Sequence, residues 1–301
     1  MASGKGRVTG KKVVRENGKS SKYINPLTDF GFKYLFGVKE LLIDFLNGVL
    51  DIESGIVDLT YDNTERVPHS EEERVARFDL RCTTGTGEHV IIEMQNHSQV
   101  FFKDRTVYYV TFPIQEQAPK GKDWNFMLKP VYSVNIVNFR MRDVEPQEMN
   151  KLEESEEKYI SYVQLIDRDT KKIFYKKLTL VYLELPLFTK TESELQTGVE
   201  KWTFVLKHLP DLNDLPDILR NEVFEKLFQM AEIAKLSTKD RKEYYRSLKS
   251  YRDMNNCIAQ RDQKIAVLKQ EKAAYQKEKA AYQREIAELR HRLGLNDINV
   301  N

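Results

Sequence analysis

The chain has 301 residues, of which 41% are hydrophobic and 11% aromatic, with 48 basic and 46 acidic side chains. This composition is too apolar for a wholly disordered chain, and the length suffices for one sizeable core with an appendage. No segment approaches the roughly 18 uncharged apolar residues of a membrane helix, and the first residues lack a secretory apolar segment. Two cysteines are too few for a disulfide scaffold. We therefore expect a cytoplasmic protein without a membrane partner.

The charge is unevenly distributed along the chain. Residues 1–22 carry seven Lys or Arg and one acid, and residues 241–293 carry fourteen basic and seven acidic side chains, so the middle of the chain is net acidic. A basic arm rich in Gly and Ser is expected to be disordered and to contact a polyanion such as DNA. A solvated tail and a solvated helix face would carry the same charges, so both interpretations stay open. The arm residues considered for DNA contact are Lys11, Lys12 and Arg15.

The first elements after the arm are predicted to be a turn, a helix and a strand. Residues 25–29 (NPLTD) combine a turn with a helix-start signal. Residues 38–50 place apolar side chains at helical spacing and predict an amphipathic helix. Residues 56–62 alternate weakly and indicate a strand.

Residues 75–82 and 90–95 predict a β-hairpin. In the first segment Ala76, Phe78, Leu80 and Cys82 alternate with polar residues, and the second segment, VIIEMQ, alternates in the same way after a Gly-containing turn. Two strands joined by so short a loop pair antiparallel. Folding about Thr86 brings Asp79 opposite Glu93, with β-carbons roughly 4.5–5.5 Å apart and Gln95 next on the same face.

The remaining segments predict more strands and a helical C-terminal half. Residues 100–117 are expected to form a helix interrupted near Pro113, and Pro130 opens a buried strand, VYSVNIVNF. Further strands are expected at 159–166 and 173–184, and further helices at 192–208, 215–235 and 238–253.

Residues 258–293 carry a heptad pattern. Ile258, Ile265, Ile286 and Leu293 are separated by multiples of seven, and Leu268, Tyr275, Tyr282 and Leu289 repeat three positions later. We call these eight residues the seam. Thirty-six helical residues span roughly 54 Å, too long to be buried in one core, so a partner helix and a homo-oligomer are expected. Lys272 and Lys279 interrupt the apolar pattern, and a single exposed helix is the alternative.

Two acids and an amide on one hairpin face suggest a metal site. Carboxylates placed directly opposite one another destabilise a ladder, and a divalent cation between them would remove this repulsion. Mg²⁺ prefers one or two carboxylates with water and phosphate, and it activates water against a phosphodiester. The structural alternative is a solvated polar face neutralised by Arg77, Arg81 or Arg105.

Several collinear segments resemble the PD-(D/E)XK nuclease family transposases, which are relatives of the recombination-promoting nucleases. The matching segments are DFGFKYLFG (29–37), LLIDFLNGVL (41–50), RFDLRC (77–82), VIIEMQ (90–95), KDRTVYYV (103–110), KPVYSVNIVNF (129–139) and YRSLKSYRDMNN (245–256). The resemblance covers residues from about 23 to 256 in matching order.

This resemblance implies a restriction-endonuclease-like α/β fold, a mixed sheet flanked by helices, that cuts DNA with Mg²⁺. Asp79 and Glu93 would be the metal ligands and catalytic acids, and the third catalytic position, usually written as Lys in the motif, is Gln95, as is usual in this transposase group. Asp29 and Lys33 match the N-terminal DxxxK part of the family pattern, and the first helix supplies Glu40 as a third accessory residue. Arg105 is considered for DNA contact. The implied organisation is a basic disordered arm (1–22), a nuclease-like core (23–190), a helical region (191–256), a coiled coil (257–293) and a disordered tail (294–301).

Two functions follow as rival hypotheses. The first is a Mg²⁺-dependent DNA endonuclease of mobile-element type, paired through the coiled coil. The second is a nuclease fold with weak or no turnover that binds nucleic acid and assembles, because an uncharged Gln95 cannot stabilise an anion as an ammonium does.

Overall fold

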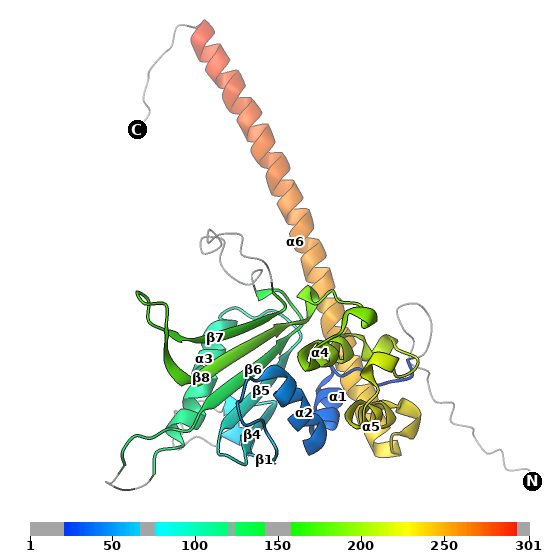
Figure 1. The fold of residues 1–301 in the computed structure, drawn as a ribbon. Coiled ribbons are helices and arrows are strands. Elements are labelled where there is room, and N and C mark those ends of the chain that lie inside the picture. The colour runs from blue at the N-terminus through cyan, green and yellow to red at the C-terminus, as the bar shows by residue number, and fades with distance from the viewer. Residues whose placement is uncertain (1–20, 67–75, 120, 122–123, 142–157, 294–301) are drawn as a thin grey trace, which may run out of the picture. The chain divides into compact units, whose positions relative to one another are not determined.

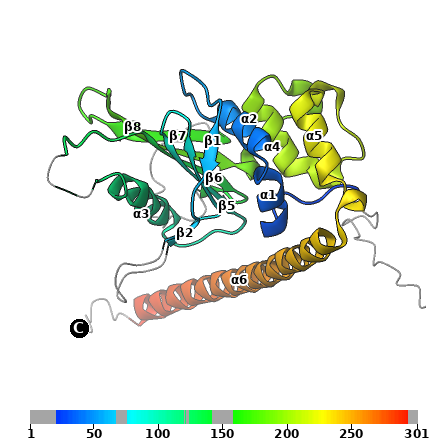
Figure 2. The same cartoon turned by 90° about the horizontal axis from the view of Figure 1, so that it is seen from below.

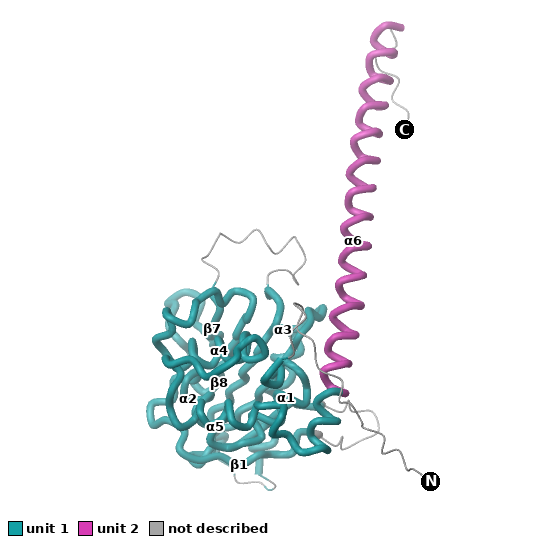
Figure 3. Tube along the Cα trace, turned by 90° about the vertical axis from the view of Figure 1, so that its right-hand side faces the viewer, with its two compact units in different colours: residues 1–245 teal, residues 246–301 magenta. Residues whose placement is uncertain are grey.

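The computed structural model describes residues 21–66, 76–119, 121, 124–141 and 158–293 (Figure 1). The chain divides into two units, residues 1–245 and 246–301 (Figure 3). Residues 1–20 of the expected basic arm, with Lys11, Lys12 and Arg15, and the expected tail at 294–301 lie outside the described residues. Within the described residues, no helix combines the length and the apolar character that a membrane span requires.

A mixed six-stranded sheet forms the centre of the first unit, in the order β1-β4-β5-β6-β8-β7. Strands β5, β6 and β8 run parallel to one another, and the pairs β1/β4, β4/β5 and β7/β8 are antiparallel. A separate two-stranded sheet pairs β2 with β3. The strands are β1 (Leu59–Tyr61), β2 (Glu65–Arg66), β3 (Ala76–Arg77), β4 (Leu80–Thr84), β5 (His89–Gln95), β6 (Val131–Val137), β7 (Ile160–Ile166) and β8 (Ile173–Glu184).

Helices flank this sheet on both sides, as the sequence predicted. Helix α3 covers one face, and α1, α2, α4 and α5 are grouped on the other (Figure 2). The helices are α1 (Asp29–Phe36), α2 (Lys39–Val49), α3 (Phe102–Gln115), α4 (Gly198–His208), α5 (Glu222–Ala231) and α6 (Thr238–Arg292). Helix α1 begins where the sequence predicted, because the Thr28 side chain accepts a hydrogen bond from the Gly31 N–H (3.0 Å).

The core between α1, α2, α4 and α5 is aromatic. The Trp202 ring lies 5.6 Å from both Phe36 and Phe45 between ring centroids, and its indole N–H donates to Asp44 Oδ1 (2.6 Å). Helices α2 and α4 approach closely at Gly48 and Gly198. A Cβ on Gly48 would lie 3.1 Å from the Gly198 carbonyl carbon, so the two glycines permit this packing.

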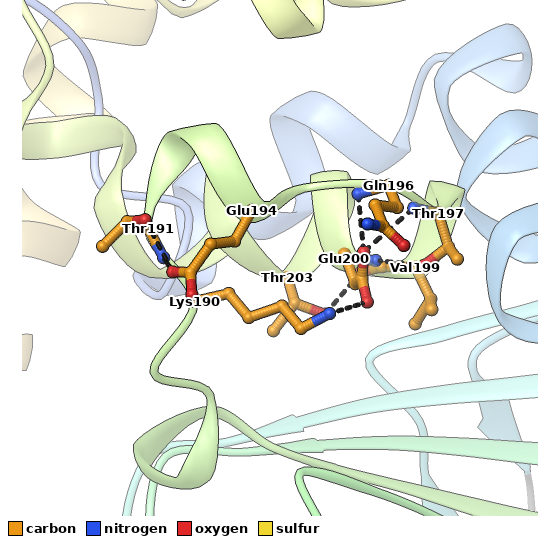
Figure 4. Close-up of polar contacts among 8 residues, drawn as sticks. All are labelled: Lys190, Thr191, Glu194, Gln196, Thr197, Val199, Glu200 and Thr203. Atoms are coloured by element: carbon orange, nitrogen blue, oxygen red, sulfur yellow. Dashed lines mark hydrogen bonds and ion pairs between the residues drawn. The ribbon is translucent and has the colours of Figure 1, made fainter.

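A polar cluster around the buried Glu200 determines where α4 begins. Thr197 caps the helix, and the Glu200 carboxylate accepts hydrogen bonds from the backbone N–H groups of Thr197 (3.0 Å) and Gln196 (2.7 Å) and pairs with Lys190 (Figure 4). Burial alone would raise the pKa of Glu200, but Lys190 and the two backbone donors outweigh it and hold the pKa at about 2. The carboxylate therefore stays ionised and keeps the cap formed.

Two of the expected C-terminal helices are shorter than predicted. The segment 192–208 contains one 3-10 turn (Glu192–Glu194) and then α4, because Thr197 makes an extended N-cap between them. The segment 215–235 becomes helical as α5 only after Asn221, whose side chain accepts from the Phe224 N–H (2.8 Å). In both cases the capping side chain accepts a hydrogen bond from the backbone and fixes the first turn of the helix. The helix therefore begins later than the periodicity predicted.

Two expected interruptions are absent from the described helices. Pro113 lies inside α3, in its last turn, and the Glu116 N–H still donates to the Phe112 carbonyl (2.9 Å). The helices expected at 238–253 and 258–293 are one helix, α6, because residues 254–257 contain no Pro or Gly that would end it. The supercoil with a partner helix stays a prediction.

Phe78 does not share the face of Leu80 and Cys82, contrary to the predicted alternation. It packs with Ile91 and Phe112 on the side of the sheet covered by α3. The reason is a break in the strand, since β3 ends at Arg77 and β4 begins at Leu80. The alternation of side chains holds only within a continuous strand.

Candidate functional site

The β4–β5 hairpin brings Asp79 and Glu93 together. Leu80 pairs with Ile92 and Cys82 with Val90, so the hairpin is centred on Thr86, as predicted. Asp79 directly precedes β4 and extends this register. Its backbone N–H donates to Glu93 Oε1 (3.2 Å), and its own Oδ2 accepts from the Met94 N–H (2.8 Å). Each acid is thus held by a backbone donor on the opposite segment.

Glu93 is buried and Asp79 is half-buried, which changes the protonation of both carboxyl groups. Glu93 is only 7% exposed. Burial, and then the charge of Asp79, raise the pKa of Glu93 to about 8, against the opposing influence of the Asp79 N–H, Arg105 and Lys33. Burial also raises the pKa of Asp79 above its ordinary range, and the Met94 N–H opposes it. At neutral pH Glu93 is therefore mostly protonated when no cation is near.

This pair fits a hard divalent cation. Within the described ranges, no group of three or more His, Cys, Asp or Glu side chains could hold a metal. Asp79 and Glu93 would therefore supply two protein ligands, with water and phosphate completing the shell, which is the donor set that Mg²⁺ prefers. The described residues donate no hydrogen bond to Asp79 Oδ1 or Glu93 Oε2, so one oxygen of each acid is available. A cation would also offset the burial and the repulsion from Asp79 that together keep Glu93 protonated.

Gln95 ends β5 on the face of Glu93, and its amide is oriented by two neighbours. Its Nε2 donates to the His97 carbonyl (3.1 Å), and its Oε1 accepts from Arg105 Nη2 on α3 (2.9 Å). The amide orientation is assigned from these contacts. The expected polar face therefore includes a cation that comes from a different element of the fold.

Helix α1 adds a second cation near the acids. Lys33 lowers the pKa of both Asp79 and Glu93, and Asp29 raises that of Asp79, so both side chains are electrostatically coupled to the pair. Lys33 and Asp29 also form an exposed ion pair (2.7 Å) one helical turn apart. The structure thus brings two of the three accessory residues toward the hairpin.

Other charged residues lie elsewhere. The side chain of Glu40, the third accessory residue, is exposed and pairs with Lys226 on α5. Arg81 is buried and pairs with Glu116 and Asp62, and it does not neutralise the acid pair. The side chain of Arg77 is exposed.

Asn135 is a buried polar residue that sequence reasoning missed. It pairs in register with Glu93 across the parallel strands β5 and β6 and is fully buried. Its amide nitrogen donates to the Val181 carbonyl (3.2 Å) and to Ser133 Oγ (3.0 Å), while Oδ1 has no partner among the described residues. A polar residue inside an apolar strand, VYSVNIVNF, is the signal that could have found it.

The mixed six-stranded sheet with flanking helices is consistent with a restriction-endonuclease-like α/β protein, and its hairpin carries a pair of coupled acids. The sequence profile of the PD-(D/E)XK nuclease family transposases matches residues 26–261. The chain therefore belongs to this family, which indicates a nuclease or transposase role and a DNA substrate. Nucleases of this family usually use divalent metals. No curated protein and no solved structure shows significant similarity to the chain.

Proposed function

We propose that this protein is a Mg²⁺-dependent DNA endonuclease of mobile-element type that hydrolyses phosphodiester bonds. The observation that carries the proposal is a pair of coupled acids, the half-buried Asp79 and the buried Glu93, each held by a backbone donor of the opposite segment. Such a pair is unfavourable as a purely structural element, because two carboxyl groups with raised pKa values occupy one site.

The residues have separate roles in this proposal. Asp79 and Glu93 bind the cation, which would polarise the phosphodiester and lower the pKa of an attacking water. Glu93 must lose its proton for this, so binding of the cation and ionisation of Glu93 are linked. Gln95 orients the water or a phosphate oxygen through its amide.

A plasmid-nicking assay with Mg²⁺ tests the proposal. Asp79→Asn and Glu93→Gln keep the shape of each side chain and remove its charge, so each is expected to lower the rate by at least about 100-fold, through the several kcal/mol that a metal supplies. Asp51→Asn is the matched control, because Asp51 is an exposed acid in the loop after α2. The enzymatic proposal is wrong if the parent fails to cut with every divalent metal that is tried, or if the two variants cut as well as the parent.

A second candidate is a nucleic-acid-binding and assembly protein with little turnover. It is favoured by Gln95, which carries no charge and whose amide is already engaged by Arg105 and the His97 carbonyl. A mobility-shift experiment on the same preparations separates the two candidates. Duplex binding by the parent without any cleavage across Mg²⁺, Mn²⁺ and Ca²⁺ would favour the second.

We also propose that copies of the chain associate through the seam of α6. Seven of the eight seam residues are exposed, among them Leu268 at 53% and Leu289 at 50%, so α6 presents an apolar stripe that a second copy could cover. Leu268→Glu is expected to shift the sedimenting species to a monomer. Val267→Glu is the control, since Val267 is equally exposed, at 51%, but lies off the seam. An unchanged oligomer in Leu268→Glu, or equal effects of both variants, would contradict the proposal.

A further inference from the structure

The candidate site contains a cation, Arg105, that comes from helix α3 and not from the hairpin. Gln95 is neutral, yet Arg105 of α3 donates from Nη2 to Gln95 Oε1 at 2.9 Å. The guanidinium also acts on both acids, because it lowers the pKa of Asp79 and of Glu93. One residue from a helix thus contacts the amide and influences the acid pair at the same time.

Arg105 is held in a fixed position. Its guanidinium carbon lies 5.2 Å from the centroid of the Phe102 ring and 5.6 Å from that of Tyr109, and Nη1 donates to Gln99. Helix α3 is itself anchored beneath it, since Thr106 Oγ1 and the Tyr182 hydroxyl on β8 are hydrogen-bonded at 2.6 Å. The cation is therefore preorganised on a regular element that packs against the sheet.

The charge of Arg105 is not consumed by an ion pair. Among the described residues, no carboxylate lies within ion-pair distance of its guanidinium, although Asp79 and Glu93 are close enough to respond to it. Its Nε is buried and has no hydrogen-bond partner in the same part of the chain. A buried donor without a partner is costly and points to a ligand that completes it.

We propose that Arg105 supplies the positive charge that Gln95 lacks, by binding a non-bridging oxygen of the scissile phosphodiester while it holds the Gln95 amide in place. This inference rests on the proposed function and assigns a specific role within that site. Arginine suits the role because its planar guanidinium has five N–H donors, so it can contact the amide and a phosphate oxygen together. Lysine has one charged atom and cannot hold both groups in the same geometry.

A charge exchange between positions 95 and 105 tests the proposal. Arg105→Met is expected to lower the cleavage rate by about 100-fold, the usual cost of removing one donor to a developing anion. Gln95→Lys alone is expected to be impaired, since it sets an ammonium against the guanidinium. The double variant Gln95→Lys/Arg105→Met is expected to cut faster than either single variant, because one cation is then present again.

Binding provides a readout that does not depend on turnover. The affinity of each variant for a short duplex in the presence of a chelator is expected to fall several-fold in Arg105→Met and to recover in the double variant. Arg105→Lys is expected to retain most of the affinity and to lose rate. Lys103→Met, an exposed cation on the same helix, is the control, and thermal melting verifies that all variants are folded.

The outcomes separate this inference from the proposed function. If the parent cuts and Arg105→Met cuts equally well, the inference is wrong and the nuclease stands. A double variant no faster than Arg105→Met also overturns it, because the role of Arg105 is then structural. If the parent does not cut, duplex affinity decides, and equal affinity of the parent and Arg105→Met overturns the inference.

Discussion

The β4–β5 hairpin and the seam of α6 both have a periodic apolar pattern in sequence, but they differ in how far their apolar faces are buried. The apolar face of the hairpin, with Val90 and Ile92, is fully buried, whereas Leu268 and Leu289 of the seam are about half exposed. The hairpin finds its cover in the same chain, in the helices that pack on the sheet. Periodicity therefore identifies a face of an element, and the tertiary structure decides whether the chain itself covers that face.

The difference extends to the polar residues of the two regions. In the hairpin, burial makes two carboxyl groups depart from their ordinary pKa values. On α6 the charged residues around the seam are exposed to solvent. Substitutions in the hairpin should thus change stability and protonation, and substitutions in the seam should change association.

The largest expected effect contrasts one substitution type in the seam and in α2, one of the helices that pack on the sheet. Leu42→Ala removes a fully buried side chain of α2 and should lower the free energy of unfolding by about 3 kcal/mol through lost burial and a cavity. Leu289→Ala should cost less than about 0.5 kcal/mol in dilute solution, since Leu289 is half exposed. Denaturant titration at low protein concentration measures both. Equal losses would mean that the seam is covered within one chain.

The next effect concerns pH and Glu93. In the unfolded chain Glu93 ionises near its ordinary pKa, and in the folded protein near 8, so between these values the folded state holds the extra proton. The contribution of Glu93 to the stability of the metal-free protein should therefore be greatest at acidic pH. The free energy of unfolding should fall by about 2–3 kcal/mol as pH rises from 6 to 9. Denaturant titrations across this range measure the decline. Glu93→Gln, which does not ionise, should flatten the curve.

A cation should alter the same curve. Saturating Mg²⁺ replaces the proton at the acid pair and should remove most of the decline in stability above pH 6, while its apparent affinity should rise with pH up to about 8. Calorimetric titration at several pH values measures this affinity. Magnesium affinity that is independent of pH would place the cation away from Glu93.

The smallest effect tests a local signal in α4. Thr197→Ala removes the side chain that caps this helix and accepts from the Glu200 N–H, and it should cost about 1 kcal/mol. Thr197→Ser keeps the hydroxyl and should cost only a few tenths of that value. Thermal unfolding of both variants measures the difference, and equal losses would show that the methyl group, rather than the cap, stabilises this position.

The sequence was most informative where neighbours along the chain interact. The turn after β4 sets the hairpin register, so symmetry about Thr86 was enough to place Asp79 opposite Glu93. The cap at Thr28 and the span of α2 followed from short-range patterns in the same way. The break at Phe78 was not predictable by alternation, because β3 pairs in a different sheet from β4.

Contacts between distant segments were beyond the reach of sequence patterns. Asn135 lies beside Glu93 only because β5 and β6 pair parallel in one register, and that pairing joins segments separated by a helix. Glu40 lay near the expected accessory residues in sequence, yet its partner is Lys226, far along the chain on α5.

Local composition and spacing by themselves determined the elements, the hairpin register, the facing acids and the heptad pattern of α6. Only the tertiary structure decided that Arg105 contacts Gln95, that Lys33 acts on the acid pair, and that Glu93 is buried. The physical reason is that register and periodicity depend on short-range backbone geometry. Burial and charge coupling depend on which distant segments the fold packs together.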